Sequence, residues 1–248
     1  MIYIMDLNIR GENSMKLEGC SNSGFSLTEV RKSQILELYQ WVNSNIEYEK
    51  TYKQIQEDIE NSCKHLDASK VRMLVPFLRK MGYISNYGFE QKNSIIKLVN
   101  FFTIEGKVFI EYLKLGQIIS LLNQEDISNE MKRIDELFSM ISMLNLIFNG
   151  EEIYLDVIKF LKKYRHMDKN EFFIMTTLQN QYECEEYIQM LDKYIKQYRN
   201  GEIGQLEIVK HQNSFNYVKS LLIETSLIVQ DRSILSLNKK HDNLLNLL

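Results

Sequence analysis

The stretch from Asp67 to Ile84 (DASKVRMLVPFLRKMGYI) constrains the fold most, because a single capped helix accounts for its residue pattern. Aspartate and serine, here Asp67 and Ser69, are common at helix N-caps, and glycine, here Gly82, is common just after the end of a helix. Between them, apolar residues recur at helical spacing and make one face: Val71, Leu74, Val75, Leu78 and Met81. The sequence therefore predicts an amphipathic helix.

The opposite face of this helix is basic. At about 100° per residue, the residues opposite the apolar stripe are Ser69, Arg72, Pro76, Arg79 and Lys80, with Lys70 at the flank. No acid occurs from Ala68 to Lys80. Such a face is suited to contact phosphates or to enter a groove of a nucleic acid. The alternative is a solvated helix face that lacks acids by chance.

The residues after the helix add a β-hairpin signal. A short apolar exit, Tyr83 and Ile84, leads to a polar turn at 85–92 and then to a β-prone run at 95–104. Helix, strand, turn and strand in this order indicate a winged helix, in which the helix before the wing is the recognition helix. We therefore expect Lys92 and Lys97, in the wing, to follow a DNA backbone.

The rest of the chain predicts a mainly α fold with short β-hairpins. Helical spacing predicts further helices at 26–45, 51–63, 105–122, 128–148, 151–164, 169–178, 183–199 and 214–225, and a last one from Lys239. A second hairpin is expected to turn at 230–232, between apolar runs at 227–229 and 234–237. Both halves of the chain then end in a helix, a hairpin and a second helix. We therefore expect Lys219 and Arg232 to contact DNA in the second half as the basic residues of the first helix and wing do in the first half.

This repeated ending favours tandem winged-helix domains. The predicted organisation is a flexible N-terminal segment at 1–25, in which only Ile2 to Met5 are β-prone, a first domain at 26–123 and a second at 124–248. The joint at 123–128 is polar and short, so the two halves are expected to pack closely.

Net charge and cysteine spacing argue against two classes of function, non-specific polyanion binding and zinc binding. The 248 residues carry a formal net charge of −3, which argues against a non-specific polyanion binder, so any nucleic-acid contact must be local. Cys20, Cys63 and Cys184 lack zinc-site spacing and are expected to be reduced thiols. The N-terminus lacks signal-peptide features and no apolar stretch is long enough for a membrane span, so we expect a cytoplasmic protein without membrane contact.

No pattern of catalytic residues stands out. The four histidines have no metal-ligand spacing, and no glycine-rich phosphate loop occurs. A metal-dependent nuclease needs an acid upstream and an acid-x-lysine triplet on one strand. Glu105-Gly106-Lys107 and Glu130-Met131-Lys132 match that triplet, but they are expected at a helix start and inside a helix, where chance explains them better. We therefore predict no catalytic residues, no metal ligands and no cofactor in this chain.

Several segments resemble a known family. They are RMLVPFLRKMGYI (72–84) with the following TIEGKVFIEYL, a long apolar helix paired with DKNEFF (168–173), YRNGE (198–202) and the closing stretch 217–237. In these the chain, from Phe25 onward, resembles the DNA-recognition region of the AlwI-like type IIS restriction endonucleases. The resemblance implies tandem winged-helix domains that read double-stranded DNA. Members of that family carry a PD-(D/E)xK nuclease after this region, and this chain stops at Leu248.

The expectation is thus a recognition module of a restriction-endonuclease-like defence protein with its nuclease domain absent. A nuclease domain or subunit, or a second copy of the chain, is the expected further partner, and Mg²⁺ is expected only with a nuclease. Two alternatives remain. One is an acidic tandem winged-helix scaffold that binds a kleisin-type partner in a chromosome-condensing complex. The other is a transcriptional regulator, although the sequence reveals no ligand pocket or dimer helix.

Overall fold

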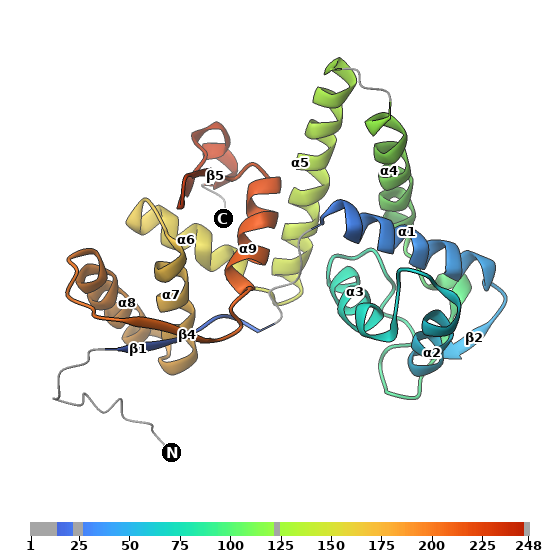
Figure 1. The fold of residues 1–248 in the computed structure, drawn as a ribbon, viewed down its shortest axis with the longest axis horizontal. Helices are drawn as coiled ribbons and strands as arrows, with labels where there is room; N and C mark the ends of the chain where they lie inside the picture. Colours follow the sequence, from blue (N-terminus) through green and yellow to red (C-terminus); the bar gives the residue numbers. More distant parts are fainter. Residues whose placement is uncertain (1–13, 22–26, 122–124, 246–248) are drawn as a thin grey trace. The chain divides into compact units, whose positions relative to one another are not determined.

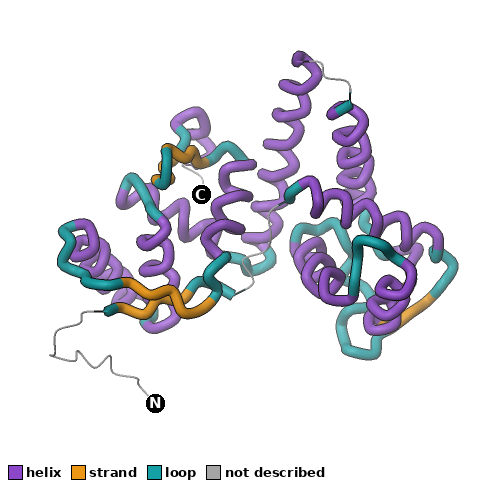
Figure 2. Tube along the Cα trace, in the orientation of Figure 1, coloured by secondary structure: helices purple, strands orange, loops and turns teal. Residues whose placement is uncertain are grey.

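Residues 14–21, 27–121 and 125–245 are described by the computed structural model, and they are mainly helical with short strands (Figures 1 and 2). The α-helices are α1 (Glu29–Ser44), α2 (Tyr52–Ser62), α3 (Ala68–Lys80), α4 (Ile104–Ser120), α5 (Glu125–Phe148), α6 (Ile153–Tyr164), α7 (Lys169–Gln181), α8 (Cys184–Arg199), α9 (Ser214–Glu224) and α10 (Asp242–Leu245). The strands are β1 (Met15–Glu18), β2 (Glu49–Thr51), β3 (Ile95–Lys97), β4 (Leu206–Lys210), β5 (Ile228–Asp231) and β6 (Ile234–Leu237). The predicted mainly helical fold with short strands is confirmed.

The chain forms two compact units. One, named here the α3 unit, comprises Gly24–Tyr154 and Ser220–Leu227; the other, the α7 unit, comprises Met1–Ser23, Leu155–Lys219 and Ile228–Leu248. The predicted boundary at 123–128 differs from this division, because it reaches into the start of α5, and α4 and α5 both belong to the α3 unit. These helices pack through aromatic rings: Tyr112 of α4 stacks on Phe138 of α5, with ring centroids 4.5 Å apart.

In the α3 unit, helices α1, α2 and α3 each begin at a side-chain cap. The caps are Thr28, Thr51 and Asp67, whose side chains accept hydrogen bonds from the first turn. The predicted helix 26–45 thus starts at Thr28, whereas Ser26 lies outside the described residues. β2, between α1 and α2, pairs antiparallel with β3.

The predicted strand at 95–104 is much shorter in the structure. Only Ile95–Lys97 forms a strand; a 3₁₀ turn follows at Leu98–Asn100, and α4 begins at Ile104. The Thr103 side chain caps α4, accepting from the Gly106 amide at 2.9 Å, so the last residue of the predicted run belongs to a helix and not to the strand. The exit residue Ile84 makes only an isolated antiparallel bridge, to Phe102.

The α7 unit is built around a buried helix. All residues from Glu171 to Leu178 of α7 are buried, and Asp168 and Glu171 form a reciprocal capping box at its start. β5 and β6 form the predicted hairpin, and Met167 bridges to Leu235 of β6. Figure 1 shows β1 and β4 side by side in this unit.

The N-terminal segment, predicted to be flexible, contains β1. This strand pairs in parallel with β4, another strand that was not predicted from the sequence. Leu17 is 0% exposed, and the backbone of Glu18 is bound by α7: its amide donates to Thr177 Oγ1 at 2.8 Å, and its carbonyl accepts from Thr176 Oγ1 at 2.6 Å. The β-prone stretch at 2–5 lies outside the described residues.

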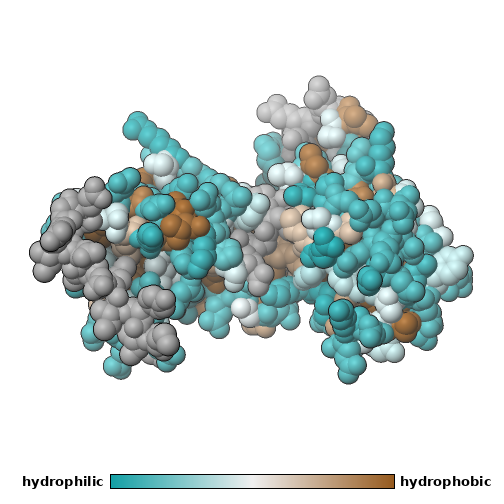
Figure 3. Space-filling model, turned by 60° about the horizontal axis from the view of Figure 1, so that its bottom comes forward, coloured by the Kyte–Doolittle hydropathy of each residue, from teal (hydrophilic) through white to brown (hydrophobic). Residues whose placement is uncertain are grey.

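The face of the molecule drawn in Figure 3 is mostly hydrophilic. Figure 3 shows hydrophobic residues in small separate patches on the face in view. Among the helices of the described ranges, none combines the length and apolar composition that a membrane span requires.

Candidate nucleic-acid interface

Helix α3 presents one apolar and one polar face, as its sequence predicts. Val71, Leu74, Val75 and Leu78 are each 0% exposed. On the other side, Ser69, Arg72 and Pro76 are exposed. Asp67 fixes the start of the helix, because its Oδ1 accepts from the Lys70 amide at 2.8 Å. The face predicted to meet DNA therefore points to solvent along the first two turns of the helix.

The C-terminal end of α3 is anchored on α5. The side-chain amides of Asn145 and Asn149 donate to the carbonyls of Met81 and Lys80, at 2.8 and 3.1 Å. These bonds satisfy carbonyls that a helix end leaves without partners. The Lys80 ammonium forms an ion pair with the Glu151 carboxylate, whose side chain is only 10% exposed. Lys80, a predicted DNA contact, is thus engaged inside the unit.

Arg79 holds the loop at 85–92 against α3. Its guanidinium lies over the Phe89 ring, 4.2 Å from the centroid, and its Nε donates to Asn86 Oδ1 at 3.1 Å. Partial burial lowers the pKa of Arg79, while the nearby Tyr52 and Glu90 act to raise it. An arginine in a protein nevertheless stays protonated, so Arg79 places a permanent positive charge where the loop meets α3.

A groove of about 370 Å³ lies between α2, α3 and this loop. Its lining includes the basic residues Lys53, Arg79 and Lys92, with Pro76, Phe89 and Glu90 between them. Glu90 is already engaged locally, because its two carboxylate oxygens accept from the Gly88 amide at 3.1 and 3.0 Å. The groove therefore offers cations from three elements beside the exposed face of α3.

The remaining predicted DNA contacts either pair with acids or belong to the α7 unit. Lys70 pairs with Asp67 at 2.7 Å, and Lys97 pairs with Glu49 at 3.3 Å across the β2–β3 ladder. Lys219 and Arg232 belong to the α7 unit: the Lys219 ammonium lies 5.4 Å from the Phe215 ring centroid, and Arg232 is exposed at the hairpin turn with a φ of 54°.

The groove brings together Arg79 and Lys92 of the predicted set and adds Lys53, while Arg72 lies on the exposed face of α3 and, like Arg79, acts electrostatically on Tyr52. Sequence reasoning missed Lys53, because the outer face of α2 looked acidic from Glu57, Asp58 and Glu60. Lys53 Nζ lies 3.5 Å from Glu57 and remains largely exposed. No sequence signal identifies Lys53, since only the packing of α2 against α3 places it at the groove.

The acid-x-lysine triplets lie in helices. Glu105 and Lys107 are in the first turn of α4, and Glu130 and Lys132 are in α5. Residues two apart on a helix point about 200° apart, so acid and lysine cannot converge on one ion. Within the described part of the chain, no group of three or more His, Cys, Asp or Glu residues could hold a metal ion.

Comparisons with known proteins identify no family. No protein-family model, curated protein or solved structure matches this chain.

Proposed function

We propose that this chain binds duplex DNA through α3 and the loop at 85–92. One observation carries the proposal: Arg72 is exposed on the acid-free face of α3 and, among the described residues, has no acid within 4.0 Å. The groove beside it adds Lys53, Arg79 and Lys92. Lys53 pairs with Glu57 at 3.5 Å, whereas Arg72 and Lys92 have no ion pair with a described acid, so these two cations are available to displace counterions from DNA phosphates.

The order of elements supports a winged-helix interpretation of the α3 unit. It runs α1, β2, α2, α3, loop and β3, with β2 paired to β3. The α7 unit has a similar order in α6, Met167, α7, α9, β5 and β6, with Met167 bridging to β6 and with α8 and β4 inserted before α9. This parallel supports tandem winged-helix domains, with α3 as the recognition helix of the first.

The resemblance to the AlwI-like recognition region supports a role in a restriction-type defence system. In this role the chain supplies sequence recognition, and a nuclease, with its Mg²⁺, would be a joined domain or a separate subunit.

The test is duplex binding by fluorescence anisotropy at several salt concentrations. If Arg72 contacts a phosphate, Arg72→Ala should lower the slope of log K against log salt by about one unit. If it contacts a base edge, the variant should lose roughly 1 to 3 kcal/mol on the preferred sequence and little on random duplex. Arg133→Ala is the matched control, because Arg133 is an exposed arginine of the same unit, paired with Glu130 on α5.

A more severe variant gives the decisive outcome. Arg72→Ala with Lys92→Ala removes two exposed cations without disturbing Arg79, which holds the loop. Duplex affinity equal to that of the wild type at moderate salt would rule out α3 and its loop as the DNA-binding surface.

A protein partner is the second candidate, and α5 favours it. Leu137, Ile141 and Phe148 are 59%, 43% and 82% exposed at helical spacing, a stripe suited to an apolar partner surface. An acidic scaffold that binds a kleisin-type chain would use such a face. In that case wild-type DNA binding would be weak and salt-labile, and Leu137→Ser with Ile141→Ser would abolish partner binding while Arg72→Ala would not.

A further inference from the structure

Exposed basic residues surround the C-terminal hairpin of the α7 unit. They are Arg165, His166, Lys169, Arg232, Lys239 and Lys240, which we name the hairpin patch. Only Arg232 was predicted from the sequence as a DNA contact. The others come from the α6–α7 turn, from the first residue of α7 and from the residues after β6, and no sequence pattern connects them.

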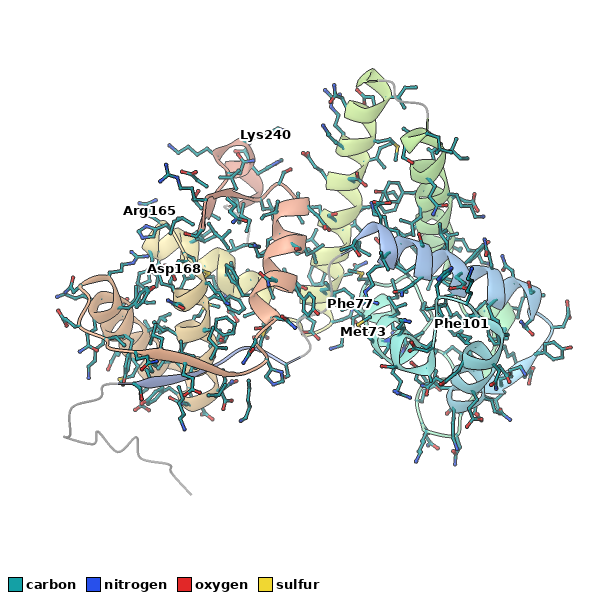
Figure 4. All side chains as sticks on the ribbon, viewed as in Figure 1. Met73, Phe77, Phe101, Arg165, Asp168 and Lys240 are labelled. Atoms are coloured by element: carbon teal, nitrogen blue, oxygen red, sulfur yellow. The ribbon has the colours of Figure 1, made fainter. Side chains whose placement is uncertain are left out.

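A backbone pairing brings these segments together. Met167 and Leu235 exchange two hydrogen bonds, of 3.0 and 2.8 Å, so the α6–α7 turn runs antiparallel beside β6. Successive Cα atoms are ~3.8 Å apart, which places every residue of the patch within about 20 Å of this pair. Figure 4 labels Arg165, Asp168 and Lys240 in this unit. The patch is therefore local, although its members are up to 75 residues apart in sequence.

Arg199 fixes the turn that carries Arg165. Its Nη1 and Nη2 donate to the carbonyls of Tyr164 and His166, at 3.2 and 2.9 Å, and its Nε donates to Glu171 Oε1 at 2.6 Å. Arg165 itself has a φ of 74°, a left-handed conformation that is uncommon for a residue with a side chain. This network keeps the Arg165 backbone in place before any ligand binds.

Acids do not neutralise the patch. Elsewhere in the unit, basic residues have partners: Lys163 pairs with Asp192, Arg199 with Glu171 and Lys210 with Glu18. No ion pair within 4.0 Å joins a member of the patch to a described acid. Asp168 lies among these residues, but its carboxylate accepts from the Glu171 amide and the Tyr198 hydroxyl, each at 2.8 Å. Asp231, on β5, is the exposed acid beside the turn.

We propose that the hairpin patch is a second DNA-binding surface, which contacts the phosphate backbone of duplex DNA. The proposal rests on the proposed function and extends it to the α7 unit. Phosphates repeat every ~3.4 Å along each strand, so a cluster of this extent faces several of them. Lysine and arginine side chains that contact phosphates provide charge rather than base discrimination, so the patch contributes affinity that is independent of sequence.

The test uses the full chain, random duplex and anisotropy across a salt series. The patch variant is Arg165→Gln/Lys169→Gln/Lys240→Gln. The matched control is Lys16→Gln/Lys193→Gln/Lys196→Gln, exposed lysines of the same unit carried by β1 and α8. Each variant changes the formal net charge from −3 to −6, a loss of three positive charges. Thermal melting is measured alongside to verify that both variants fold.

The patch variant should lower the slope of log K against log salt by about 2 to 3 units and raise Kd at 0.1 M salt by at least about tenfold, whereas the control should match the wild type. Equal slopes for patch variant, control and wild type, with Arg72→Ala still weakening binding, would overturn this inference alone. No duplex binding by the wild type would overturn both proposals. A patch variant that keeps the duplex slope but loses binding of polyglutamate would reassign the patch to an acidic protein.

Discussion

At the scale of single residues, buried charge has the clearest consequences. Burial raises the pKa of Glu224 to about 7, with Asp135 adding to the shift and Lys32 opposing it. Burial also raises the pKa of Asp135. A carboxylate whose pKa is higher in the folded state than in the unfolded state favours folding only while it is protonated. Its contribution is therefore present at low pH and is lost as pH rises from about 4.5 to about 7.

We predict that Glu224→Gln stabilises the protein above neutral pH. The neutral amide removes the cost of a buried charge, so the free energy of unfolding at pH 8 should rise by on the order of 2 kcal/mol, with little change at pH 4.5. Urea unfolding at both pH values measures this, with the exposed Glu47→Gln as control. A variant less stable than the wild type at pH 8 would show that ionised Glu224 is stabilised in the fold.

A second residue-scale prediction concerns Lys80. Because Glu151 is buried beside it, Lys80→Ala should leave an unpaired carboxylate and cost about 2 kcal/mol of unfolding free energy. Adding Glu151→Gln removes that charge and should recover part of the loss. Chemical denaturation of the wild type, the single variants and the double variant gives the coupling. A Lys80→Ala protein of unchanged stability but reduced duplex affinity would instead place Lys80 at the DNA.

At the scale of elements, the start of α4 fixes the residues that follow α3. The Thr103 amide and hydroxyl bind the carbonyls of Tyr83 and Gly82, at 3.1 and 2.7 Å. The Tyr83 ring stacks on Phe109 with centroids 4.2 Å apart, and its hydroxyl bonds Ser142 at 2.6 Å. Burial raises the pKa of Tyr83 to about 12. The glycine of the IEGKV segment is required for this contact, because a Cβ at Gly106 would lie 1.9 Å from the Tyr83 carbonyl oxygen.

Two glycines of α4 should therefore respond in opposite ways to alanine. Gly106→Ala should cost at least about 2 kcal/mol, because backbone must move to admit the methyl group. Gly116→Ala should stabilise by about 0.5 to 1 kcal/mol, since its Cβ would meet only the Met131 methyl group at 3.7 Å and alanine favours a helix. Melting temperatures of the two variants test the pair. A tolerated Gly106→Ala would mean that α4 packs less closely on Tyr83.

At the scale of the whole molecule, the chain passes between its two units more than once. The segment Ser220–Leu227 belongs to the α3 unit although the residues on either side belong to the α7 unit. Ser226 donates to Glu136 of α5 at 2.7 Å. A division at 123–128 would remove α5, and with it the groups that cover Tyr83 and Phe109 and that bind the end of α3.

We predict that a fragment of residues 27–154 melts cooperatively, whereas a fragment of residues 27–123 does not. The shorter fragment exposes Tyr83 and Phe109, which are 2% and 1% exposed in the whole chain, and lacks the asparagine amides that cap α3. Circular dichroism melting and amide exchange would distinguish the two. A cooperative transition in the shorter fragment would support the boundary expected from the sequence.

The sequence alone determined the elements whose signals are local. The capped helix at Asp67, the helices that begin after Thr51 and Asp168, and the hairpin around Arg232 are set by neighbouring residues, and each was predicted within a few positions. The amphipathic face of α3 was predicted for the same reason. Periodicity reports which face of a helix is apolar, and burial follows it.

Only the tertiary structure decided the rest, because it depends on contacts between distant residues. β1 is a strand through its pairing with β4, about 190 residues further on, and through two threonines of α7. Lys80 forms an ion pair inside the α3 unit because Glu151, far along the chain, lies beside it. The Met167–Leu235 pairing brings the residues of the hairpin patch close together. Local propensity cannot encode such pairings, because each requires two distant segments to meet at a specific register.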